Sequence, residues 1–299
     1  MFAVVTSKEG IARELSLGEV VSETFDLLRR NFVNYFIVFA IAEIVIGLAT
    51  LLAHRVVQLP TIPTNSTSLS WVPGYFSALF GLYLIIEVAT LVVIPIAEGT
   101  AIKMTAEAID GKPVSLGTSV RFALSKLLWL WALSLTVGVI VVLGFVALIA
   151  PGIILAIMLC LALPALLLEN TGVFGSLSRS RELVGHRWGK TFVVFIVLGL
   201  IILVIAIIVT LVSDLFGGAG PVVSGFLSAF YQPILPIALT VYFFSNRARM
   251  ASPPQTGQVT MGYGSAPQPG MKFCPNCGTQ LPASATFCAN CGAKQPTRS

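Results

Sequence analysis

The chain has 299 residues, of which only 10% are charged and 56% are hydrophobic, with a formal net charge of +5. Soluble domains average about 25% charged residues, and from Leu127 to Leu168 this chain has none. A soluble globular fold is therefore excluded, and the mean hydropathy of +0.91 predicts an all-α polytopic membrane protein.

The N-terminal residues, 1–15, are predicted to form a short cytoplasmic segment. They lack the apolar core of about 7–15 residues that a secretory signal needs, so we expect no cleaved signal peptide in this part of the sequence.

Six stretches are long and apolar enough to cross the hydrocarbon core as helices, which takes about 20 residues each. They lie at residues 32–53, 75–98, 127–149, 153–169, 192–214 and 222–245. Pro151 and Gly152 are predicted to divide the long third run, because both residue types disfavour a continuing helix. The spans and the segments between them define a transmembrane domain over residues 16–247.

The basic residues predict the orientation of the spans. Of the 18 Lys and Arg residues, only Arg55 lies in a loop that follows an odd-numbered span. Because Lys and Arg accumulate in cytoplasmic loops, we expect both termini in the cytoplasm and a multi-pass protein of the plasma membrane. The sequon at Asn65 would then lie in an outer loop, where glycosylation depends on the host.

Three segments look alike: SLGEVVSETFDLLRRNF at 16–32, SLGTSVRFALSKLLWLW at 115–131 and GSLSRSRELVGHRWGKTF at 175–192. Each has the pattern of an amphipathic helix and leads into an odd-numbered span. Pro95, Pro164 and Pro236 recur in the even-numbered spans. We interpret this as a degenerate three-fold repeat of a cytoplasmic amphipathic helix and a transmembrane hairpin. The alternative is that such features occur in any polytopic protein.

Together with LIAPGIILAIMLCLALPALLLEN at 148–170, the first and third of these segments resemble the membrane domain associated with glycerophosphoryl diester phosphodiesterases. The resemblance covers roughly residues 10–247 and implies a stand-alone member of that family, many of whose members are of unknown function. The phosphodiesterase barrel of some members is absent from this sequence. Since the chain has only two His, His54 and His186, the family's metal-assisted chemistry does not carry over, and we expect no enzyme.

Two carboxylates interrupt the apolar spans, Glu43 in the first and Glu87 in the second. Each lies eleven residues from the cytoplasmic end of its span, which is about 16 Å along a helix. On antiparallel neighbours they would meet near mid-membrane and share a proton, forming a proton or cation site. The alternative is two protonated acids bonded to polar neighbours such as Ser77, Thr90 or Thr210.

The C-terminal tail is predicted to be a separate soluble part. Residues 248–270 are rich in Pro and Gly and are expected to form a flexible linker, followed by a zinc ribbon at 271–293 and an end segment at 294–299. The ribbon contains two Cys-x-x-Cys pairs. Their members are Cys274, Cys277, Cys288 and Cys291.

Four thiolates at this spacing predict one structural, tetrahedral Zn²⁺, as in the ribbons appended to many prokaryotic proteins. Two disulfides are the alternative, which a cytoplasmic location disfavours. Lys272, Lys294 and Arg298 are the only basic residues nearby, so the ribbon lacks the dense basic stripe of a nucleic-acid module.

The sequence therefore favours a membrane-anchored scaffold or regulator, held in the lipid bilayer, that recruits a cytoplasmic protein partner through the ribbon. The alternative is a proton- or cation-coupled transporter or channel that uses Glu43 and Glu87. The sequence is compatible with an oligomer.

Overall fold

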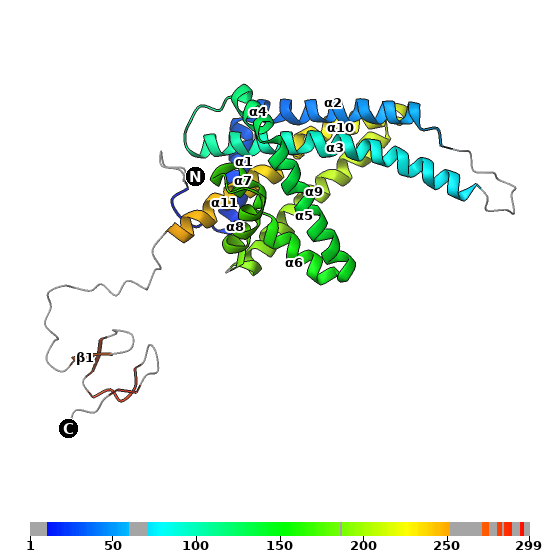
Figure 1. The fold of residues 1–299 in the computed structure, drawn as a ribbon. Coiled ribbons are helices and arrows are strands. Elements are labelled where there is room, and N and C mark those ends of the chain that lie inside the picture. Colours follow the sequence, from blue (N-terminus) through cyan, green and yellow to red (C-terminus); the bar gives the residue numbers. More distant parts are fainter. Residues whose placement is uncertain are drawn as a thin grey trace. The chain divides into compact units, whose positions relative to one another are not determined.

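The computed structural model describes residues 11–59, 71–185, 187–251, 271–274, 280–282, 284–288 and 294–295. The chain divides into two compact units, Met1–Ala251 and Ser252–Ser299 (Figure 1). Asn65 and most of the predicted linker lie outside the described residues. The exact domain boundaries expected from the sequence stay predictions.

The regular elements described in the first unit are all helices, and the second unit contains a small two-stranded sheet. In chain order the elements are α1 (Leu17–Arg30), α2 (Phe32–Val56), α3 (Val72–Ile109), α4 (Leu116–Ser125), α5 (Leu127–Ala147), α6 (Ile149–Leu159), α7 (Ala162–Glu169), α8 (Val173–Gly185), α9 (Trp188–Asp214), the 3₁₀ turn η1 (Gly217–Ala219), α10 (Gly220–Tyr231), α11 (Ile234–Ala251), β1 (Met271–Phe273) and β2 (Gln280–Pro282).

The predicted all-α polytopic fold is confirmed, because the described residues contain six segments long and apolar enough to cross a membrane. They are Phe32–Val56, Val72–Ile109, Leu127–Ala147, Ile149–Glu169, Trp188–Asp214 and Val222–Ala251. The second segment extends well beyond the predicted end at residue 98. Its last turns, including Ala101, Met104 and Thr105, are buried. These turns pack against protein, so their sequence is less apolar than that of a lipid-facing helix.

Prolines determine where the helices break. Pro151, Pro164 and Pro236 are each the third residue of a helix, α6, α7 and α11 respectively. A proline ring clashes with the carbonyl four residues earlier and supplies no N–H, but both costs are small in the first turn of a helix. The third run therefore breaks at Leu148, which is extended, and the prediction of a break at Pro151–Gly152 was wrong by three residues.

The other two breaks were not predicted. They fall at Cys160–Leu161 and at Gln232–Pro233, in the fourth and sixth predicted spans. At the first of them, Ser180 of α8 bridges the interrupted backbone, because its Oγ accepts a hydrogen bond from Leu161 N (3.1 Å) and donates one to Met158 O (2.7 Å). Pro95 is different, since it lies inside the continuous helix α3.

The three repeat units close into a ring. The amphipathic helix α4 packs on α3 of the preceding unit, α8 packs on α7, and α1 packs on α11 of the last unit. The helices α3, α7 and α11 also contact one another and form the centre of the fold. Two hydroxyl pairs tie odd-numbered spans to this centre: Tyr35 Oη to Thr105 Oγ1 and Thr191 Oγ1 to Tyr242 Oη, each at 2.8 Å.

The first amphipathic helix is also fixed at its start. Ser16 Oγ accepts a hydrogen bond from Glu19 N (3.3 Å), and Glu19 Oε2 accepts one from Ser16 N (2.8 Å), which together form a capping box. This box satisfies two of the unpaired N–H groups at the helix start.

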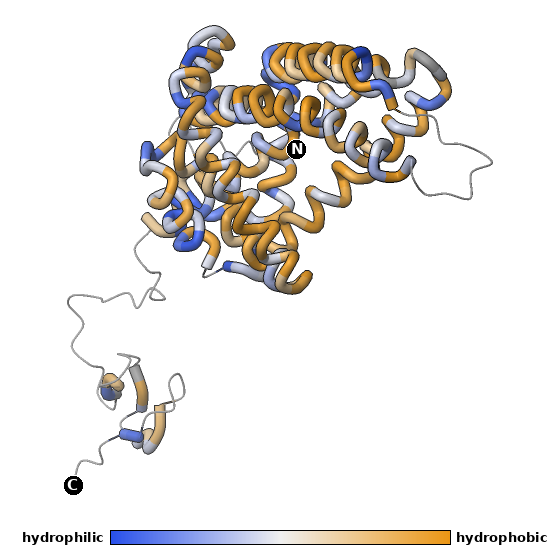
Figure 2. The backbone as a smooth tube through the Cα atoms, turned by 45° about the vertical axis from the view of Figure 1, so that its right-hand side comes forward, coloured by the Kyte–Doolittle hydropathy of each residue, from blue (hydrophilic) through white to orange (hydrophobic). Residues whose placement is uncertain are grey.

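The outer faces of the long helices are apolar. Leu128, Leu143, Leu211 and Phe80 are among the exposed large hydrophobic side chains. Figure 2 shows these helices mostly in orange, whereas blue gathers in the short helices and the connections. Such a surface suits lipid rather than water.

Candidate functional site

The candidate metal centre begins at the end of β1. This strand pairs antiparallel with β2, with Phe273 opposite Gln280, and Phe287 forms a bridge with Lys294. Cys274 and Cys288 each follow one of these paired residues. Both Cys side chains are buried in one cluster with Leu281.

Gln295 adds a contact that the sequence did not predict. Its side chain is buried, and its Nε2 donates a hydrogen bond to Cys274 Sγ at 3.4 Å. Amide donors around a metal-bound thiolate stabilise its charge and fix its orientation. The sequence analysis looked for residue types that bind zinc directly, and Gln is not one of them, so this contact was missed.

Two of the four predicted ligands can thus be placed. Cys277 and Cys291 lie outside the described residues, and the described part contains no group of three or more His, Cys, Asp and Glu that could hold a metal ion. The buried thiols of Cys274 and Cys288 and the amide donor fit a structural zinc ion bound by thiolates. The complete set of four ligands and the single ion stay predictions.

The carboxylate of Glu43 lies between α2 and α10. Gln232 Nε2 donates a hydrogen bond to Glu43 Oε1. A Cβ added at Gly225 of α10 would lie 3.4 Å from Glu43 Oε2, in van der Waals contact, so the carboxylate lies close to the α10 backbone. Gln232 Oε1 is buried without a hydrogen-bond partner.

Glu87 lies in a different environment, on the exposed side of α3. Among the described residues no hydrogen bond joins the carboxyl groups of Glu43 and Glu87, although α2 and α3 pack side by side. The shared proton stays a prediction.

The sequence analysis gave three hydroxyl groups as alternative hydrogen-bond partners of Glu43 and Glu87. Each of them instead donates a hydrogen bond within its own helix. Ser77, Thr90 and Thr210 donate to the carbonyls of Gly74 (2.9 Å), Ile86 (3.0 Å) and Ala206 (2.9 Å). The partner of Glu43 is instead Gln232. A signal for it was present, because Gln232 is the only side-chain amide in the span predicted at 222–245.

Charged side chains tie the N-terminal segment to the start of α9. Glu14 accepts hydrogen bonds from Lys190 Nζ at 2.5 Å and Arg187 Nη2 at 3.2 Å. Burial alone would raise the pKa of the Glu14 carboxyl, but these cations lower it overall. Lys190 also donates to Leu15 O (2.7 Å), and Ser245 Oγ accepts from Leu15 N (2.8 Å).

Two carboxyl groups of α1, Glu19 and Glu23, also have shifted pKa values. The hydrogen bond from Arg13, together with the bonds from Ser16, lowers the pKa of Glu19 to about 2. Burial on α1 raises the pKa of Glu23, an effect that Arg30 partly offsets. Specific ion pairs therefore hold the N-terminal segment and the start of α1 in place.

Comparison with known proteins identifies one part of the chain. Residues 273–295 match the zinc-ribbon domain, so the C-terminal unit contains a zinc ribbon. No curated protein and no solved structure matches the chain. The match covers the ribbon alone, and no comparison supports the family resemblance of residues 10–247.

Proposed function

We propose that the protein is a non-enzymatic, membrane-anchored scaffold whose zinc ribbon binds a cytoplasmic protein partner. The observation that carries this proposal is the exposure of two aromatic side chains on the ribbon. Phe273 and Phe287, each directly before a described Cys, are 51% and 59% exposed. Aromatic residues supply much of the binding energy in protein interfaces.

Two exposed Phe rings are a large share of the apolar surface of such a small module. Its described core contains only Cys274, Cys288 and Leu281 with Ala285 beside them. A module that leaves its two Phe outside such a small core gives up apolar burial that would stabilise it. The loss is offset if a partner covers the rings.

We also propose that both termini face the cytoplasm. Contacts bring basic residues before the third and fifth spans close to the N-terminal segment and the end of α7: Lys190 contacts Glu14, Arg179 contacts Glu169, and Lys126 donates to Asn170 next to Glu169. A single basic end is what the positive-inside rule requires of the cytoplasmic side. The family resemblance of residues 10–247 is likewise a proposal, supported by sequence alone.

Site-specific photo-crosslinking in cell membranes tests the scaffold proposal. A photoreactive side chain replaces Phe273 or Phe287 in the full chain, and Ser284, which is exposed on the same module, serves as the matched control. We expect the same crosslinked protein from both Phe positions and much less from Ser284. The product should disappear when Cys288→Ser removes a zinc ligand. Equal products at all three positions, or products that survive Cys288→Ser, would contradict the proposal.

A second candidate function is a proton- or cation-coupled transporter or channel using Glu43 and Glu87. The observation that favours it is the site at the α10–α11 break. Pro233 and Pro236 supply no N–H to the carbonyls of Ala229 and Gln232, and Gln232 Oε1 has no partner. Broken helices with unpaired carbonyls beside a carboxylate are a way to bind cations inside membranes.

Flux through proteoliposomes tests this candidate. Glu43→Gln keeps a group that can accept from Gln232 Nε2, so the fold should persist while any proton- or cation-coupled flux is lost. Glu87→Gln tests the predicted second carboxylate in the same assay. Flux in the wild type that both variants retain would eliminate these carboxylates as the coupling site.

A further inference from the structure

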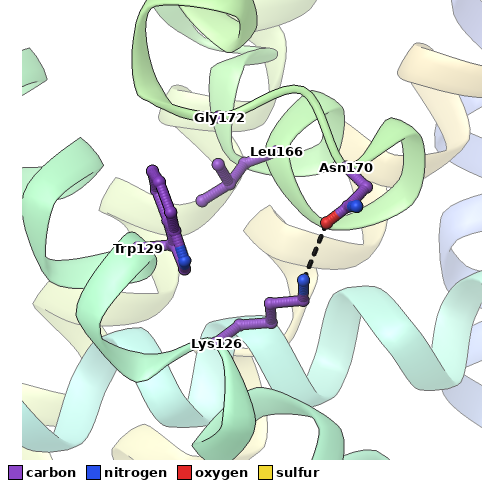
Figure 3. A pocket seen from close by; sticks show the side chains of 5 residues that line it. All are labelled: Lys126, Trp129, Leu166, Asn170 and Gly172. Carbon is purple, nitrogen blue, oxygen red and sulfur yellow. Dashed lines mark hydrogen bonds between the residues drawn. The ribbon is translucent and has the colours of Figure 1, made fainter.

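A small cavity lies where two candidate membrane spans end. It has a volume of about 280 Å³ and is lined by Lys126, Trp129, Leu166, Asn170 and Gly172 (Figure 3). Lys126 directly precedes α5, and Asn170 directly follows α7. These are the ends of the spans Leu127–Ala147 and Ile149–Glu169, so the cavity lies at the level where hydrocarbon gives way to lipid headgroups.

The turn between α7 and α8 shapes one wall. Asn170 has φ 54° and Gly172 has φ 56°, both in the left-handed region, and together they redirect the chain into α8. A Cβ at Gly172 would lie 3.9 Å from the Trp129 ring. Figure 3 shows this ring on one side of the cavity, with Lys126 and Asn170 on the other.

The cavity contains a cation, Lys126, that has no counterion among the described residues. Lys126 Nζ donates a hydrogen bond to the neutral Asn170 Oδ1 at 2.7 Å. The neighbouring carboxylate, Glu169, is already bound by Arg179 through two hydrogen bonds of 2.8 and 3.1 Å. Within the described ranges Lys126 has no ion pair, so two of its three ammonium protons remain for an anion.

Part of the cavity lining is apolar. Trp129 and Leu166 line it, Trp129 is 52% exposed, and Trp is the residue type enriched at membrane interfaces. A free inorganic anion gains nothing from an apolar wall, whereas acyl chains do. The start of α8 at Val173 adds the positive end of a helix dipole beside Gly172.

We propose that this cavity binds the phosphate of an anionic membrane glycerophospholipid. The ammonium of Lys126 contacts the phosphate oxygens, Asn170 positions the ammonium, and the glycerol and upper acyl carbons lie along the exposed ring of Trp129. The site is independent of the proposed scaffold function, since it uses no residue of the ribbon.

Native mass spectrometry of the purified full chain, titrated with phosphatidylglycerol, tests the site. Lys126→Gln removes the cation, and Asn170→Asp keeps the hydrogen-bond acceptor but neutralises the ammonium with a carboxylate. Asp tolerates the left-handed backbone, so this second variant preserves the turn. We expect each change to weaken phosphatidylglycerol binding about tenfold, the loss of one charge-assisted contact.

The matched control is Arg121→Gln, which removes the same charge from the exposed side of α4 and should leave binding unchanged. Circular dichroism verifies that the variants are folded. Wild-type affinity in Asn170→Asp, or equal losses in Arg121→Gln and Lys126→Gln, would overturn the proposal. Displacement of the lipid by millimolar inorganic phosphate would overturn the lipid assignment and leave a small-anion site.

Discussion

A single tryptophan compensates for a proline inside the membrane. Pro95 supplies no N–H to Leu91 O, four residues earlier in α3, and Trp131 Nε1 of α5 donates a hydrogen bond to that carbonyl at 2.6 Å. In lipid, water cannot replace a missing donor. We therefore expect Trp131→Phe, which keeps an aromatic ring but removes the N–H, to destabilise the membrane unit.

The destabilisation expected for Trp131→Phe lies between two reference values. Leaving a desolvated polar group unpaired costs about 1–3 kcal/mol, and hydrogen bonds between membrane helices measure about 0.6 kcal/mol on average. In a Pro95→Ala background the new backbone N–H at position 95 can bond to Leu91 O, so Trp131→Phe should cost about 1 kcal/mol less there.

Reversible unfolding of the detergent-solubilised chain in SDS, followed by circular dichroism, measures the four free energies of this cycle. Trp188→Phe provides the control, because Trp188 stacks on Phe192 and its replacement should cost the same in the wild-type and Pro95→Ala backgrounds. A coupling energy of zero between positions 95 and 131 would refute the reasoning.

Three further predictions concern other parts of the chain. Replacing Gln295 by Ala should weaken zinc binding by about tenfold or more in a metal-competition titration, because it removes a donor next to the metal. The folded-state pKa of Glu14 is lowered, so the stability from its bond with Lys190, about 1 kcal/mol, should be present above the unfolded pKa and be lost as the pH falls through the folded one. Thermal unfolding of Glu14→Gln should lack this acid-side loss, and an unchanged pH profile would contradict it. A Cys placed at Ser68 should react with an impermeant thiol reagent outside intact cells while one at Gly111 should not, and the reverse pattern would invert the proposed topology.

Hydropathy was sufficient to predict the six spans, because a helix in lipid must be apolar along its length. Hydropathy could not predict the part of a helix that packs against protein instead of lipid. The last turns of α3 are buried by α4, α7 and α11, and their polar residues, such as Thr105, are satisfied by hydrogen bonds within the fold. A window average cannot distinguish such a buried end from a loop.

The positions of the three breaks were readable in principle. In α6, α7 and α11 the proline is the third helical residue, so each break follows from the reach of a proline ring to the carbonyl four residues earlier. The Glu43–Gln232 contact was readable only in part: Gln232 is the one side-chain amide of its predicted span, but its pairing with Glu43 depends on the packing of α2 against α10. The same holds for Gln295 and Cys274, which chain folding alone brings together.

The ring of repeat units also changes the role of the amphipathic helices. The pattern alone predicted amphipathic helices on the cytoplasmic side. In the structure Val20, Leu27 and Leu28 of α1 are buried, and α1 packs on α11, the last helix of the membrane unit in the sequence. The bond from Leu15 N to Ser245 Oγ joins positions 230 residues apart. Because the first helix completes its packing only against the last one, the three hairpins depend on each other for stability. The apolar face of α1 is used within the protein and is not free for lipid, so the proposed lipid site lies elsewhere, at Lys126 between α5 and the α7–α8 turn.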